Sequence, residues 1–136
     1  MTLLEQLIRD EGLKLFPYKD EVGKITIGVG RNLTDVGISR AEATTLLIGD
    51  IQNAKDHLAQ QFPWTVGLDD ARRDALVAMT FNMGIGGLAS FKTFLAAMQA
   101  GNWTAARDAM LDSEWAKQVG ARAQRLAVQV DSGTYQ

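Results

Sequence analysis

Three side chains near the start of the chain have the types and spacing of a small acid–base site: Glu11, Asp20 and Thr26. Asp20 and Thr26 lie within the glycine-punctuated stretch KDEVGKITIGVG, which begins at Lys19, and Glu11 precedes it. Two carboxylates in different surroundings can cleave a glycosidic bond, because one protonates the leaving oxygen while the other activates water or attacks the sugar. The same residues would suit a solvated turn, so their spacing alone leaves both interpretations open.

The expected surroundings of the two carboxylates differ in the way that such chemistry requires. Glu11 is expected in the last turn of a helix, where the helix dipole raises the cost of ionising a carboxylate, so it suits the role of the acid. Asp20 lies beside a turn and is expected to be better hydrated, which suits the base. Thr26 is expected to point the same way as Gly28 and to hold a water molecule through its hydroxyl.

The elements that must position these residues are a first helix and a hairpin. Apolar residues at helical spacing predict a helix over about residues 3–11, with Thr2 as N-cap and Gly12 just after its end. Two strands are predicted next, at 16–20 and 24–29, with the turn 21–23 between them. A third short strand is expected near residues 31–33.

The rest of the chain predicts helices. Ser39 and Glu42 form a capping box that begins a helix over about residues 40–61, which stops before Pro63. At about 1.5 Å per residue this helix is long enough to bridge two lobes. Five further helices are predicted, over residues 70–83 with Asp69 as cap and Gly84 at the end, 88–100, 103–111, 114–119 and 121–130.

These elements predict an α+β fold that is mostly helical. A small β-hairpin N-lobe and an all-helical C-lobe would be joined by the long helix, and a cleft between two such lobes is a common place for a ligand.

The composition narrows the function classes. The chain has 136 residues, 46% of them hydrophobic, which is enough for a packed core. Its 14 basic and 16 acidic residues give a net charge of −2, and no basic run points to nucleic acid or to a membrane surface. There is no cysteine and no metal-ligand cluster, so we expect neither metal nor cofactor. No apolar stretch approaches the roughly 20 residues of a membrane span, and no secretory signal is recognised.

The opening stretch resembles a known family. The pattern E-x8-D-x2-G-x2-T-I-G-x-G, from Glu11 to Gly30, is similar to the active-site signature of the phage-type lysozymes, the endolysin muramidases of the T-even phage kind. The resemblance continues along most of the chain, through the long helix and then at residues 68–73, 81–84, 113–115 and 121–123. It implies a lysozyme-like fold in one domain, 1–136, with an N-lobe over about 12–38, an interlobe helix over about 40–61, and a C-lobe over about 64–136 that also includes the first helix, 3–11.

The resemblance also implies roles for the three opening residues. Glu11 would be the general acid, Asp20 would position or activate the water, and Thr26 would help to hold it. Family members of this kind are thought to invert the anomeric centre, so a gap that admits water is expected between Glu11 and Asp20.

Further residues carry expectations from the same resemblance. Phe81 would line the cleft and contact the substrate, and Asn32, Tyr18 and Gly30 are expected to bind substrate with it. Three more residues are expected to position the site without contacting the substrate. Arg122 would approach the catalytic glutamate, and Asp10 would pair with Arg125 and so connect the first helix to the last.

One departure from the family pattern leads to a specific expectation. Arg31 stands where a relative has histidine, and Asp50 matches the aspartate partner of that histidine, so we expect an Arg31–Asp50 ion pair. Other features have plainer interpretations: the three tryptophans are expected to pack in the core, and His57, the only histidine, to be solvated or capping. Arg72 and Arg73 are expected on a salt-bridged helix face.

The resemblance implies a hydrolase that cuts the β-1,4 bond between N-acetylmuramic acid and N-acetylglucosamine in bacterial peptidoglycan. A lytic transglycosylase and a non-catalytic peptidoglycan-binding module of a virion are the alternatives. We expect a monomer that accumulates in the host cytoplasm and reaches the periplasm and cell wall at lysis, once a membrane-perforating holin has acted.

Overall fold

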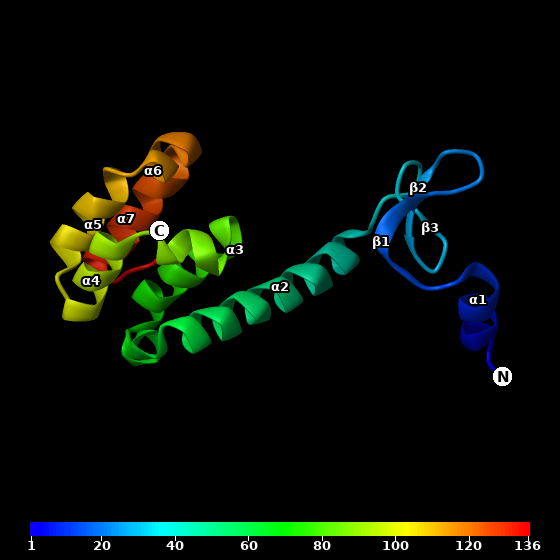
Figure 1. Ribbon diagram of the computed structural model, residues 1–136, viewed down its shortest axis with the longest axis horizontal. Helices are drawn as coiled ribbons and strands as arrows, with labels where there is room; N and C mark the ends of the chain where they lie inside the picture. The colour runs from blue at the N-terminus through cyan, green and yellow to red at the C-terminus, as the bar shows by residue number, and fades with distance from the viewer. The chain divides into compact units, whose positions relative to one another are not determined.

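The computed structural model describes residues 1–136, and its contacts divide the chain into two compact units. Unit 1 is Met1–Leu46 and unit 2 is Leu47–Gln136. The chain is mostly helical with one small antiparallel sheet, which confirms the α+β class (Figure 1). None of the helices has the length and apolar character needed to cross a membrane.

Unit 1 begins with helix α1 (Leu3–Glu11), which has the predicted bounds. Its N-terminus is closed by a full capping box, because the Thr2 hydroxyl accepts from the Glu5 amide and the Glu5 carboxylate accepts from the Thr2 amide. Its C-terminus stops at Gly12, where φ is +77°, a value that glycine adopts without strain. These local signals place Glu11 at the last position of the helix.

A three-stranded antiparallel sheet follows, in the order β1-β2-β3. Its strands are β1 (Lys14–Lys19), β2 (Ile25–Gly28) and β3 (Arg31–Asn32). The first two strands have somewhat different bounds from the prediction. Asp20 and Lys24 belong to the hairpin turn, which is closed by the Asp20 N to Lys24 O bond of 2.9 Å. Strand β2 ends at Gly28, where φ is +69°.

Helix α2 (Arg40–Gln61) begins in unit 1 and ends in unit 2, with the bounds that the sequence predicts. The expected capping box is present: the Glu42 amide donates to the Ser39 hydroxyl at 3.1 Å, and the Ser39 amide donates to Glu42 Oε1 at 2.9 Å. Pro63 then starts a short 3-10 helix, η1 (Pro63–Gly67).

Unit 2 is otherwise helical. Its remaining helices are α3 (Asp70–Ala89), α4 (Lys92–Ala100), α5 (Trp103–Leu111), α6 (Glu114–Val119) and α7 (Ala121–Ser132). Figure 1 shows α4, α5, α6 and α7 gathered into one group of short helices, in which α5 packs against both α4 and α7.

The region after Gly84 differs in part from the prediction. The sequence predicts a helix end at Gly84 and a new helix from residue 88. The backbone at Gly84 is non-helical (φ +76°, ψ 163°), as a helix end there requires, so α3 consists of two helical pieces that meet at this residue, and the second ends at Ala89. The next helix starts only at Lys92. A Cβ at Gly87 would lie 3.0 Å from Met83 Cγ, so glycine avoids a close contact with this side chain.

The hydrophobic core lies in unit 2. Its largest fully buried apolar side chains are Leu58, Leu76, Met79, Leu88, Phe94, Met98, Met110 and Val130. Trp115 is also buried and meets Phe91 edge to face, with ring centroids 6.3 Å apart, as expected for a tryptophan that packs rather than binds.

Candidate active site

Two of the predicted catalytic residues line one open recess in unit 1. This recess has a volume of about 570 Å³ and takes Glu11 from the end of α1 and Asp20 from the hairpin turn. Tyr18, on β1, also lines it, together with Asp10, Lys19, Glu21 and Val22. The fold of unit 1 therefore brings together two carboxylates that are nine residues apart in sequence, at a solvent-open surface.

The position of Glu11 depends on its approach to Gly30. A Cβ at residue 30 would lie 3.1 Å from Glu11 Oε2, and the φ of Gly30 is +67°. A Cβ there would force the carboxylate to shift by a few tenths of an ångström, and glycine adopts this backbone angle without strain. The carboxylate is otherwise exposed, so it is accessible to a substrate.

Asp20 is held by its own turn. Its Oδ1 accepts hydrogen bonds from the backbone amides of Val22 at 3.0 Å and Lys24 at 2.8 Å. Both bonds go to the same oxygen, so Oδ2 takes part in neither and remains available to orient a water molecule. The turn fixes the carboxylate without covering it, since the residue is only partly buried.

Thr26 differs from the other two residues because it is buried in the sheet, with 4% of its surface exposed. It lies on the central strand β2, opposite Tyr18 on β1 and Asn32 on β3. Its hydroxyl donates to the Lys24 carbonyl at 3.0 Å. The hydroxyl oxygen can still accept a hydrogen bond, so a role in holding water stays a prediction.

Asn32 serves a turn in this structure. Its side-chain carbonyl accepts from the Asp35 amide at 3.0 Å, and its NH₂ group donates to Asp35 Oδ2 at 3.1 Å. The oxygen and the NH₂ group of the Asn32 side chain therefore both have a hydrogen-bond partner in the turn. Its predicted contact with a sugar stays a prediction, as does that of Tyr18.

Arg31 has a partner within unit 1. It forms a bidentate ion pair with Glu42, with Nη1–Oε1 and Nη2–Oε2 distances of 2.8 and 2.7 Å. Asp50 lies in unit 2, so the expected Arg31–Asp50 pair stays a prediction. The hydrogen bond from Arg31 and the two bonds from Ser39 lower the pKa of Glu42 to about 2. Glu42 is close at hand because the capping box already holds it at the start of α2.

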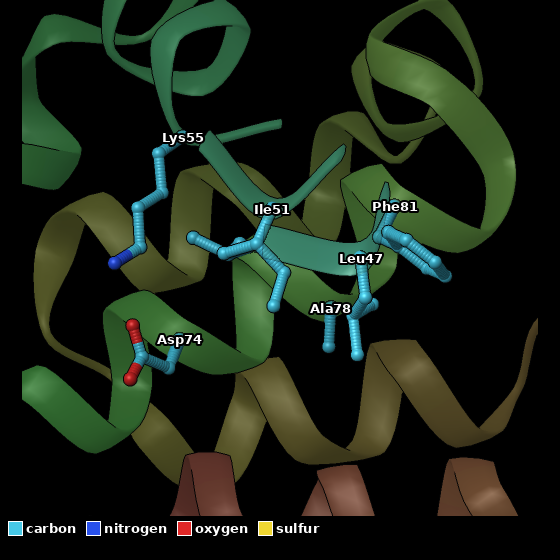
Figure 2. Close-up of a pocket in the computed structure, with 7 residues that line it drawn as sticks. Leu47, Ile51, Lys55, Asp74, Ala78 and Phe81 are labelled. Atoms are coloured by element: carbon cyan, nitrogen blue, oxygen red, sulfur yellow. The ribbon is translucent and has the colours of Figure 1, made fainter. Parts of the chain in front are cut away.

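Phe81, the predicted substrate-contacting aromatic, lies on α3 in unit 2 with half of its surface exposed. It lines an apolar groove of about 450 Å³ between α2 and α3. Figure 2 shows Phe81, Leu47 and Ala78 close together at one part of this groove, while Lys55 and Asp74 lie at another. The neighbouring Asn82 accepts a hydrogen bond of 2.7 Å from the indole N–H of Trp115.

The two partners of each expected contact between the first and last helices lie in different units. Arg122 and Arg125 are on α7 in unit 2, whereas Asp10 and Glu11 are on α1 in unit 1. Within unit 1, Asp10 pairs with Arg9 at 2.8 Å. The expected Arg122–Glu11 and Asp10–Arg125 contacts stay predictions.

The sequence interpretation missed the principal role of Arg72. Besides its expected pair with Asp69 at 3.2 Å, this arginine donates to the carbonyls of Val130 at 2.6 Å and Asp131 at 2.8 Å, near the end of α7. Its guanidinium also lies 4.1 Å from the ring centroid of Trp103. No local pattern could reveal these contacts, because the partners lie 58 and 59 residues away in sequence.

Comparison with known proteins places these observations in a family. The family model described as phage lysozyme matches residues 9–129. The chain is 34% identical to the pre-baseplate central spike protein Gp5 of Enterobacteria phage T4, over 98% of the chain but only 28% of that protein. It is 25% identical to probable T4-type lysozyme 1 of Dictyostelium discoideum, over 98% of the chain and 95% of that protein. It is 31% identical to the endolysin of Salmonella phage P22, over 79% of the chain and 77% of that protein.

Proposed function

Because the chain belongs to the phage lysozyme family, we propose that it hydrolyses the β-1,4 bond between N-acetylmuramic acid and N-acetylglucosamine in bacterial peptidoglycan. Membership supports a glycoside hydrolase, and a lysozyme implies a peptidoglycan substrate. The observation that carries the proposal is the shared recess of Glu11 and Asp20 in unit 1.

In the proposed mechanism, Glu11 donates its proton to the glycosidic oxygen as the bond to the anomeric carbon breaks. Asp20 accepts a proton from a water molecule that attacks this carbon from the opposite face, and Thr26 helps to hold that water. The product is inverted at the anomeric centre. The exposure of Glu11 and the unoccupied Oδ2 of Asp20 support these roles.

The biological role that we propose is that of an endolysin. The enzyme would act as a monomer, accumulate in the host cytoplasm, and reach the wall when a holin perforates the membrane. The similarity to the P22 endolysin supports this role. The similarity to the T4 spike protein favours a second candidate, a lysozyme domain that acts from the virion. Immunoblots of purified particles against the soluble lysate would separate the two roles.

The central experiment is a turbidity assay on outer-membrane-permeabilised Gram-negative cells. Glu11→Gln is expected to lower the lysis rate by about a thousandfold or more, because it removes the transferable proton with almost no change in shape. Glu114→Gln is the matched control, since Glu114 is an exposed carboxylate in unit 2 and its loss should leave lysis unchanged. Lysis by Glu11→Gln at the wild-type rate would refute the proposed mechanism.

Two substitutions of Asp20 distinguish a catalytic role of its carboxylate from its role in holding the turn. Asp20→Asn keeps a side-chain oxygen that can accept the Val22 and Lys24 amides, so the turn should persist while the carboxylate is lost. We expect Asp20→Asn to be as impaired in lysis as Asp20→Ala. Recovery of activity in Asp20→Asn alone would show that the residue only supports the turn.

Product analysis separates hydrolysis from the transglycosylase alternative. A hydrolase adds water and leaves reducing ends, whereas a lytic transglycosylase leaves anhydro-sugar ends. Mass spectrometry of digested peptidoglycan should therefore show hydrated products, and anhydro products would overturn the hydrolytic scheme.

A further inference from the structure

The backbone of Lys24 connects two of the expected catalytic residues. Its amide donates to Asp20 Oδ1 at 2.8 Å, and its carbonyl accepts from the Thr26 hydroxyl at 3.0 Å. The same carbonyl accepts from the Asp20 amide at 2.9 Å. The amide and the carbonyl of this one residue therefore fix the Asp20 carboxylate and the Thr26 hydroxyl relative to each other.

The next residue, Ile25, is held from the other side of the hairpin. Backbone groups of successive residues in an extended chain point to opposite sides, so those of Ile25 point away from Asp20. The Ile25 carbonyl accepts from the Leu33 amide at 2.7 Å, and the Ile25 amide donates to the Thr34 hydroxyl at 2.9 Å. Leu33 and Thr34 thus fix the backbone directly after Lys24.

Two side chains from the segment after β3 contact residues 24 and 25. Because β3 ends at Asn32, the Thr34 hydroxyl replaces a strand carbonyl as the partner of the Ile25 amide. The second contact is an ion pair of 3.2 Å between Lys24 Nζ and Asp35 Oδ2. Both charged side chains of this pair are widely exposed, so the pair contributes little. The bond to Thr34 is therefore the side-chain contact that matters more for this backbone.

We propose that Thr34 is a positioning residue of the proposed active site. Its hydroxyl holds the Ile25 amide, and through it the backbone of Lys24. The inference rests on the proposed function, because Lys24 fixes the Asp20 and Thr26 side chains to which that function assigns the attacking water. Thr34 does not line the recess, so it acts on the geometry of the catalytic groups and not on the binding of substrate.

Removal of the hydroxyl alone tests the inference. Thr34→Val deletes it with almost no change in shape, and Thr34→Ser keeps it. Reducing ends released from soluble, uncrosslinked peptidoglycan give kcat and KM. We expect Thr34→Val to lower kcat by about three- to tenfold with KM unchanged, because small displacements of catalytic groups are costly, and Thr34→Ser to keep most of the activity. Thr44→Val is the matched control, since this exposed hydroxyl bonds to the Arg40 carbonyl of its own helix.

The amide N–H signals of Val22 and Lys24 report on the Asp20 carboxylate directly, because both amides donate to it. In amide NMR spectra these two signals should move in Thr34→Val and stay in place in Thr44→Val. The other signals of residues 1–46 show in the same spectra whether unit 1 stays folded. A loss of kcat in a folded variant then reflects the geometry of the site and not a smaller folded fraction.

Several outcomes would overturn the inference: a wild-type kcat in Thr34→Val, an equal loss in Thr44→Val or in Thr34→Ser, or a change confined to KM. Unmoved signals of Val22 and Lys24 would do the same, because the hydroxyl would then not act through Lys24. All of these leave the hydrolase in place, since the wild type still cleaves the strands. Failure of the proposed function looks different, because the wild type itself would release no reducing ends.

Discussion

The two units differ most in what they bury. Every residue of the hydrophobic core lies in unit 2, between Ala54 and Val130. In unit 1 the only buried residue is Thr26, and α1 has no buried residue at all. Unit 1 nevertheless carries both carboxylates of the recess. Its geometry is held by caps, turns and glycine angles rather than by packing, so the proposed chemistry and the main source of stability occupy different parts of the chain.

The largest expected effect is a loss of unfolding free energy. It tests whether the packed core of unit 2 is the main source of stability. Phe94→Ala in unit 2 should lower the free energy of unfolding by about 3–5 kcal/mol, because the ring is 1% exposed and its removal leaves a cavity. The matched change in unit 1, Leu15→Ala, should cost less than about 0.5 kcal/mol, since Leu15 is 75% exposed. Denaturant unfolding followed by far-UV circular dichroism measures both. Similar losses in the two variants would refute the contrast.

The next effect concerns how unit 1 positions Glu11. Gly30→Ala should reduce lysis by about 10- to 100-fold, because the new Cβ displaces the carboxylate and small displacements of catalytic groups are costly. Gly23→Ala is the control: its φ of +84° gives similar backbone strain, but nothing lies within 4 Å of the new Cβ. All three tryptophans lie in unit 2, so an unchanged fluorescence transition would show that unit 2 is intact. Equal activity losses in the two variants would assign the effect to strain.

A smaller loss of stability is expected when Arg72 loses its contacts with the end of α7, which is distant in sequence. Arg72→Lys should cost about 1–2 kcal/mol, because lysine cannot donate to the Val130 and Asp131 carbonyls while lying flat on Trp103. Arg73→Lys should cost almost nothing, since Arg73 pairs only with the exposed Asp70, three residues earlier in the same helix. Tryptophan fluorescence during urea unfolding reports both values. If the two variants were equally stable, the Arg72 contacts would not contribute.

The smallest effect depends on pH. The folded pKa of Glu42, about 2, lies below its ordinary value of 4.5, so ionised Glu42 stabilises the fold above pH 4.5 and this contribution is lost as the pH falls toward 2. Glu42→Gln keeps a capping-box residue but removes the charge. Its stability deficit by circular dichroism should be present at pH 6 and shrink at pH 3. A deficit of the same size at pH 6 and pH 3 would contradict the contribution of the Arg31–Glu42 pair.

The helix bounds that the sequence predicts correctly depend on capping residues and glycines close to each helix end. Thr2, Gly12, Ser39 and Glu42 act on residues within four positions of themselves, so the bounds of α1 and α2 follow from the sequence. The break at Gly84 is local as well, because its positive φ is one that glycine adopts without strain. The start of α4 at Lys92, rather than at the predicted residue 88, did not follow from the sequence pattern.

The sequence by itself determined the family pattern, the α+β class, and the place of Glu11 at a helix end and Asp20 in a turn, since each depends on neighbours in the chain. Tertiary structure decided which groups share a surface. The approach of Glu11 to Gly30, the choice of Glu42 by Arg31 and the apolar groove between α2 and α3 all join residues distant in sequence. Such contacts depend on how whole elements pack, and this is not encoded in the spacing of any one of them.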